Sequence, residues 1–144
     1  MPVIYFLFSD KDRKAISDTV RQTLNNYYAD IKKDGLFAEF RYLDISSEFF
    51  WVPPGYPSSL SYDSISSILK KNAPLYKSIN NTWETLKVNS LTPELTNYTG
   101  TTKSIMTDSS GKVFELRLIE TGLIIKRKDG WKLLNGQTSI ISNK

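Results

Sequence analysis

The chain has 144 residues, of which 40% are apolar and 24% charged, the size and composition of an ordinary globular protein. It contains no cysteine and no histidine, which excludes disulfides, thiolate metal sites, a Ser-His-Asp triad and histidine-based metal sites. The formal net charge is +4, but the basic residues are spread along the chain, whereas nucleic-acid binding needs them on one face. We therefore expect no nucleic-acid partner and no metal.

The N-terminal segment Val3–Phe8 (VIYFLF) is too short to span a bilayer. It also lacks the basic region and the small-residue cleavage site of a signal peptide. We interpret it as a packed segment and expect no membrane partner and a cytoplasmic location. A periplasmic or secreted location stays open, because Met1–Phe8 has the alternative reading of a trimmed signal stub.

Helical periodicity dominates the first half of the chain. From Ser9 to Lys33 apolar residues recur every three or four positions, which predicts one long amphipathic helix. Leu36–Tyr42 and Tyr62–Asn72 are predicted as two further helices. The aromatic run Phe49–Val52 between them predicts a short strand, which the Pro-Pro-Gly at 53–55 ends.

The second half of the chain has the character of strands separated by turns. Asn80-Asn81, Ser109–Gly111 and Asp129-Gly130 are read as the turn signals. Helices followed by an antiparallel meander predict an α+β fold in one domain, residues 1–144, with the helices packed on one face of the sheet. The predicted strands are Trp83–Leu91, Leu95–Thr107, Lys112–Arg127 and Trp131–Ile141.

Three stretches together carry a resemblance to a known superfamily. They are Tyr27-Tyr28 with Asp34-Gly35, then SSEFFWVPPG at 46–55, and KRKDGWKLLNGQTS at 126–139. In their order and spacing they resemble the nuclear transport factor 2-like superfamily, in its SnoaL-like and ketosteroid-isomerase-like branch. The resemblance implies a cone of about three N-terminal helices packed on a curved antiparallel sheet around a central pocket. It also favours a homodimer and a bacterial source.

In this superfamily the first helix lies across the concave face of the sheet, which places its Tyr27 and Tyr28 at the pocket. By alternation along the last strand, Trp131 and Gln137 share one face, and we predict that this face is concave. Glu120 marks a site if it points inward without a partner, although a solvated or ion-paired Glu120 is the commoner arrangement. The predicted pocket residues are Tyr27, Tyr28, Phe50, Val52, Tyr56, Trp83, Glu120, Trp131 and Gln137.

The side chains that the sequence provides bear on whether the domain is an enzyme or only binds a molecule. The isomerase mechanism needs an oxyanion donor and a carboxylate base. Tyr28 and Glu120 are the candidates for the oxyanion hole, but Val52 stands before Pro53, where the isomerase has its base. We therefore expect a domain that binds a small hydrophobic or aromatic molecule without a cofactor, rather than an enzyme. The alternatives are an isomerase or cyclase that uses Tyr28 and Glu120, and an interaction or oligomerisation module.

Overall fold

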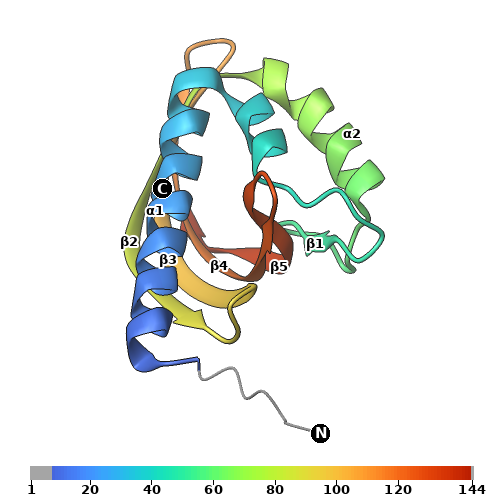
Figure 1. Ribbon diagram of the computed structural model, residues 1–144. Coiled ribbons are helices and arrows are strands. Elements are labelled where there is room, and N and C mark those ends of the chain that lie inside the picture. Colours follow the sequence, from blue (N-terminus) through green and yellow to red (C-terminus); the bar gives the residue numbers. More distant parts are fainter. Residues whose placement is uncertain (1–7, 144) are drawn as a thin grey trace, which may run out of the picture.

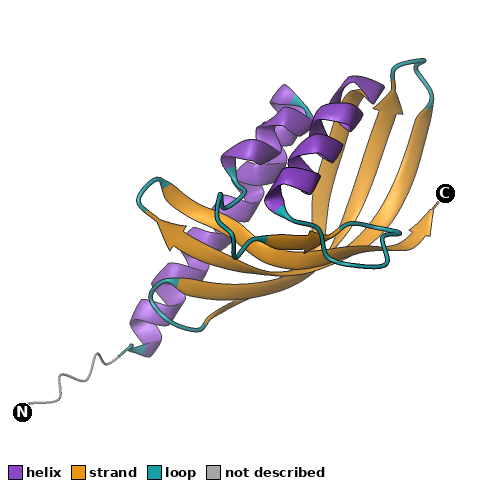
Figure 2. Ribbon diagram, turned by 90° about the vertical axis from the view of Figure 1, so that its right-hand side faces the viewer, coloured by secondary structure: helices purple, strands orange, loops and turns teal. Residues whose placement is uncertain are grey.

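The computed structural model describes residues 8–143, and its helices lie on one face of a curved sheet (Figures 1 and 2). All of the predicted packed segment Val3–Phe8 except Phe8 lies outside the described residues. No helix in the described part of the chain is long and apolar enough to cross a membrane. The elements are α1 Asp10–Asp34, η1 Leu36–Arg41, β1 Phe50–Val52, α2 Tyr62–Asn72, η2 Ala73–Leu75, β2 Tyr76–Ser90, β3 Leu95–Asp108, β4 Val113–Arg127 and β5 Gly130–Asn143.

The long helix α1 begins and ends within one residue of the predicted range Ser9–Lys33. The Ser9 side chain accepts a hydrogen bond from the Asp12 backbone N–H at 3.1 Å, which satisfies one free amide of the first turn. Gly35, with φ of 80°, ends the helix and donates its N–H to the Ile31 carbonyl at 2.8 Å. The buried face of α1 packs against the sheet and consists of Val20, Leu24, Tyr27, Tyr28 and Ile31.

The second predicted helix, η1, is a 3₁₀-helix rather than an α-helix. It is confined between the turn at Gly35 and a segment that is bonded to β5, and 3₁₀ geometry is typical of such short pieces. The third predicted helix is confirmed as α2, which Ser61 caps through a hydrogen bond from the Ser64 N–H. Together η1 and α2 cover the part of the concave face that α1 leaves open (Figure 1).

The sheet has the order β1-β5-β4-β3-β2 and is mixed. Strands β2 to β5 pair antiparallel, as predicted, and β1 pairs parallel to β5 with Phe50 opposite Asn135 and Val52 opposite Gln137. Strand β2 begins at Tyr76, well before the predicted start at Trp83. The turn predicted at Asn80-Asn81 is wrong, because both residues lie inside β2 and pair with β3, which satisfies their backbone groups.

A bulge in β5 changes which residues face the concave side. Ile124 pairs with Leu133, but Leu123 pairs with Asn135, so that Leu134 is an extra residue in β5. The prediction that one face runs unbroken from Trp131 to Gln137 is therefore wrong, since alternation reverses at the bulge. Beyond it Thr138 and Ile140 face the concave side, and Gln137 lies exposed on the convex side.

Two facing glycines let large rings lie close to the sheet. Gly122 and Gly136 are paired across β4 and β5, and the rings of Tyr98 and Trp51 cover them. A Cβ added to Gly136 would lie 2.6 Å from the Trp51 ring and 2.5 Å from the Thr121 carbonyl oxygen. No side chain fits there, so these glycines permit the aromatic floor of the concave face.

Candidate functional site

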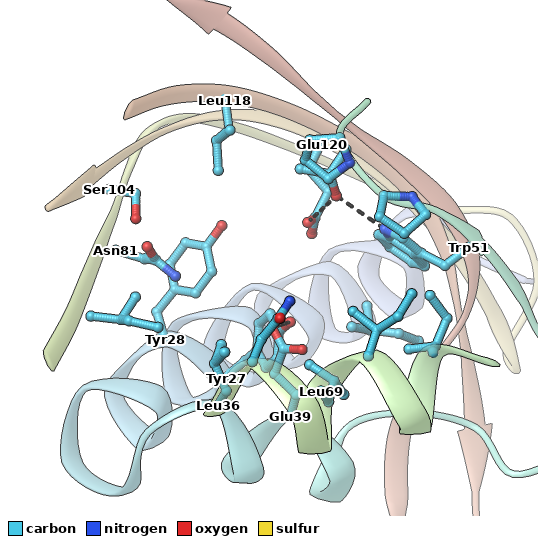
Figure 3. A pocket seen from close by; sticks show the side chains of 18 of the residues that line it. Tyr27, Tyr28, Leu36, Glu39, Trp51, Leu69, Asn81, Ser104, Leu118 and Glu120 are labelled. Carbon is cyan, nitrogen blue, oxygen red and sulfur yellow. Dashed lines mark hydrogen bonds between the residues drawn. The ribbon is translucent and has the colours of Figure 1, made fainter. Parts of the chain in front are cut away.

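A cavity of about 320 Å³ lies between the three helices α1, η1 and α2 and the concave face of the sheet (Figure 3). Its size is at the lower end of the range for small-molecule sites, roughly 300–1,000 Å³. Most of its lining is apolar, with aliphatic side chains from α2 and β4 and five aromatic rings. The rings belong to Tyr27, Tyr28, Phe49, Trp51 and Tyr76.

Glu120 on β4 is one of two carboxyl groups in the cavity lining. It is only 8% exposed and accepts hydrogen bonds from the Tyr98 hydroxyl at 2.7 Å and the Thr138 hydroxyl at 3.0 Å. The Trp51 indole N–H donates to Thr138 in turn, at 3.0 Å. Burial raises the pKa of Glu120, while the two hydrogen bonds act in the opposite direction. Glu120 is thus neither solvated nor ion-paired, contrary to the commoner arrangement.

Glu39 on η1 is the second carboxyl group, and it points into the cavity from the wall opposite Glu120 (Figure 3). The Tyr27 hydroxyl donates to its Oε1 at 2.8 Å. Within the described residues, its other oxygen, Oε2, accepts no hydrogen bond. Burial raises the pKa of Glu39 from 4.5 to about 7, with a further increase from the charge of Glu120 and a decrease from the Tyr27 hydrogen bond.

The η1 wall that carries Glu39 is fastened to the sheet just after the helix ends. The Leu133 N–H of β5 donates to the Tyr42 carbonyl at 2.6 Å, and the Asp44 N–H donates to the Leu133 carbonyl at 2.9 Å. Arg127 donates two hydrogen bonds, of 2.7 and 2.9 Å, to the buried Asp44 carboxylate. This guanidinium holds the pKa of Asp44 below its usual value. These contacts fix the position of Glu39 relative to β5.

A third polar group lies at the β2–β3 side of the cavity. Asn81 and Ser104 are paired residues of the two strands, and both line the cavity. The Asn81 Oδ1 atom is buried and has no hydrogen-bond partner in the described structure. Tyr28 lies beside them, with its hydroxyl 2.8 Å from Thr102 Oγ1. Burial raises the pKa of Tyr28 well above its ordinary value, so the hydroxyl stays protonated at neutral pH and can act as a donor.

The charged side chains of the described cavity lining are carboxyl groups. Among the described residues that line it, none is lysine or arginine. Within residues 8–143, no three carboxylates lie close enough to hold a metal ion. The lining can therefore supply hydrogen-bond acceptors, phenol donors and proton transfer by Glu39 or Glu120.

Comparison with solved structures identifies the fold. The structure is similar to a Type2 hexachlorocyclohexane dehydrochlorinase, with a TM-score of 0.74 and 12% identity over 94% of this chain and 92% of the other. It is also similar to a type3 dehydrochlorinase from Novosphingobium barchaimii LL02, with a TM-score of 0.73 and 12% identity over 94% and 93% of the two chains. A nuclear transport factor 2-like superfamily protein from Salmonella enterica matches with a TM-score of 0.74 and 10% identity over 90% and 93%.

The chain has the nuclear transport factor 2-like fold. At these identities the similarity concerns the fold alone. No protein-family model matches the sequence, and no curated protein matches it either.

In this nuclear transport factor 2-like cone, three of the nine predicted pocket residues line the cavity, namely Tyr27, Tyr28 and Glu120. Trp83 lies behind the lining and stacks on Tyr28 with ring centroids 4.5 Å apart. The remaining five lie elsewhere: Trp131 is buried in the core outside the lining, Tyr56 is exposed, and Phe50, Val52 and Gln137 line a shallow groove on the convex side. The placement of Phe50 and Val52 follows from the parallel register of β1, and that of Gln137 from the bulge in β5.

Sequence reasoning missed Glu39, although a signal for it was present. A 3₁₀-helix brings every third residue onto one face, and Leu36, Glu39 and Tyr42 have that spacing. Leu36 and Glu39 both line the cavity, and the Tyr42 ring packs edge-on against Tyr27 at 5.1 Å. Treating Leu36–Tyr42 as an α-helix obscured this face.

Proposed function

We propose that the chain binds a small, largely apolar molecule in the cavity. The observation that carries the proposal is the buried Oδ1 of Asn81, which has no hydrogen-bond partner in the described structure. An unpaired buried acceptor costs about 1–3 kcal/mol, and a ligand donor at this position removes that cost. Within the described residues Oε2 of Glu39 also accepts no hydrogen bond, so it is a second position for a ligand donor, while the body of the ligand covers the aromatic and aliphatic walls.

Ligand screening tests this proposal. Flat apolar compounds that carry hydrogen-bond donors are added in a thermal-shift assay, and hits are checked by native mass spectrometry. A compound present at a hundred times its Kd stabilises the protein by about 2.7 kcal/mol, which corresponds to a rise in Tm of several degrees. The absence of binding by every compound in both assays would refute the proposal.

Neighbouring residues on β4 provide a matched pair of variants. Leu118 points into the cavity, and Ile119 lies exposed on the other face of the strand. Leu118→Phe should fill part of the cavity and weaken the binding of any hit at least tenfold, whereas Ile119→Phe should leave binding unchanged. Equal effects of both substitutions would place the ligand somewhere other than the cavity.

A second candidate function is proton transfer, and the pKa of Glu39 favours it. A carboxyl group with a pKa of about 7 can both accept and donate a proton near neutral pH. In the predicted enzyme alternative, Tyr28 and Glu120 carry the chemistry, but Glu120 already accepts two hydrogen bonds and Tyr28 stays protonated. Glu39 is therefore the better base, with Tyr28 as a donor to the substrate.

Isotope exchange distinguishes catalysis from binding. A carbonyl compound identified in the screen is incubated with the protein in deuterated buffer, and exchange of its acidic C–H is followed by NMR. An enzyme accelerates the exchange, and Glu39→Gln abolishes the acceleration. A ligand that binds but exchanges only at the uncatalysed rate argues for a binding domain.

We also propose a homodimer that is formed through the convex face of the sheet. Phe50 exposes 43% of its surface there and lines a shallow groove with Leu123. Light scattering should give twice the monomer mass, and Phe50→Glu should restore the monomer. A dimer in a protein that binds none of the screened compounds would favour the alternative of an interaction module.

A further inference from the structure

The charges around the cavity restrict the ligand further. The chain carries a net charge of +4, yet both titratable carboxyl groups of the cavity lining point inward, and no lysine or arginine is among the described lining residues. Glu39 and Glu120 reach the cavity from opposite walls, η1 and β4 (Figure 3). An anionic ligand would meet no compensating positive charge among the described lining residues, and it would be repelled by each carboxyl group that is ionised, which a site of low polarity makes severe.

The two carboxyl groups differ in what they leave available to a ligand. Both oxygens of Glu120 already accept hydrogen bonds, from Tyr98 and Thr138. Among the described residues, Glu39 receives a single hydrogen bond, from Tyr27 to Oε1, so that its Oε2 atom is left for a donor. The carboxyl oxygen that is available to a ligand donor is therefore on Glu39, and Oδ1 of Asn81 is a second available acceptor.

An ammonium group suits the available oxygen of Glu39 better than other polar groups of similar size. It carries three N–H donors and no acceptor, whereas a hydroxyl has one donor and a carboxylate has none. Aromatic faces attract cations as well, and five aromatic residues belong to the lining, among them Tyr27 next to Glu39. A charged Glu39 without a cation is disfavoured by burial, and a bound cation would reverse that effect.

We propose that the cavity selects an organic cation, a protonated amine on a small aromatic or aliphatic body, with Glu39 as its counter-ion. This inference rests on the proposed function, because it names the chemical class of the molecule that occupies the same cavity. Glu120 contributes negative potential from the opposite wall, and the aliphatic residues of α2 and β4 cover the body of the ligand.

Three probes of nearly equal shape test the inference: naphthylmethylamine, which is cationic, naphthylmethanol, which is neutral, and naphthoate, which is anionic. Their Kd values are measured by isothermal titration calorimetry just above neutral pH. The amine should bind about tenfold or more tightly than the alcohol, and naphthoate should show no binding. Equal affinity for amine and alcohol, or tighter binding of naphthoate, would overturn the inference and leave the proposed binding function intact.

Variants of Glu39 assign the preference to this residue. Glu39→Gln should reduce amine affinity to that of the alcohol, without changing the affinity for the alcohol. Glu39→Asp should keep the preference, because the charge remains. Glu94→Gln removes the same charge from an exposed turn between β2 and β3 and should have no effect.

The outcomes separate the two proposals. If Glu39→Gln keeps the full amine preference while circular dichroism shows it to be folded, Glu39 is not the counter-ion and the inference fails. If none of the three probes binds at millimolar concentration and the broader screen also gives no hit, the proposed function fails and the inference fails with it. A hit in the broader screen that is anionic overturns the inference alone.

Discussion

Glu39→Gln should remove a pH dependence of folding stability that the wild-type protein shows. Burial raises the pKa of Glu39 from 4.5 to about 7 in the folded state, and the groups that face it are Tyr27 from α1 and Glu120 from β4. Below pH 4.5 both the folded and the unfolded protein hold the Glu39 proton. Between pH 4.5 and 7 only the folded state keeps it, so the free energy of unfolding falls as the pH rises through this window.

The magnitude follows from the difference between the two pKa values. It corresponds to about 3 kcal/mol of stability lost between the low-pH and the high-pH limits. Glutamine does not titrate and still accepts the hydrogen bond from Tyr27. Glu39→Gln should therefore gain about 3 kcal/mol relative to wild type when the pH rises from below 4.5 to above 7.

Urea unfolding followed by circular dichroism at several pH values measures this difference. Comparing the variant with wild type at each pH cancels the titration of all other groups that the substitution leaves unchanged. Glu94→Gln, at an exposed site, serves as the control and should show a constant difference from wild type. A constant difference for Glu39→Gln as well would mean that the Glu39 carboxyl group is not buried in the cavity wall, and the reasoning about the site would fail.

Two further substitutions test the floor of the cavity. Tyr98→Phe removes a donor to the buried Glu120 and should lower the free energy of unfolding by about 1–3 kcal/mol. Tyr62→Phe, at a tyrosine that is only partly buried, should change it by less than half as much in the same urea titration. Gly136→Ala places a methyl group 2.6 Å from the Trp51 ring and should cost about 2 kcal/mol or more. Thermal melting checks this, and an unchanged Tm would show that Trp51 does not lie against the sheet.

The helices were predictable because their signals are local. Ser9 and Ser61 cap α1 and α2, and Gly35 ends α1 with a positive φ; each of these effects depends on the residue and its nearest neighbours. Strand β2 was harder to delimit, because Asn80-Asn81 has the composition of a turn but pairs along its whole length with β3. There the tertiary pairing outweighs the local preference.

The lining of the cavity was predictable only in part, and the reason is geometric. Alternation along β5 gives the correct face up to Leu133, and the extra residue Leu134 then reverses it. A bulge depends on how two strands are paired, and the sequence of one strand does not contain that information. For the same reason Gln137 was placed in the pocket, and Thr138, which holds Glu120, was not.

The two acids of the cavity have different physical roles, and the hydrogen bonds decide which is which. A chain of hydrogen bonds runs from Trp51 on β1 through Thr138 on β5 to Glu120 on β4, which Tyr98 on β3 also contacts. Glu120 thereby connects four strands, and both of its oxygens already accept a hydrogen bond, so its loss should act mainly on stability. Glu39 is fixed by one hydrogen bond and keeps a free oxygen toward the cavity. Its loss should therefore weaken the binding of the proposed ligand, in addition to removing the pH dependence of stability.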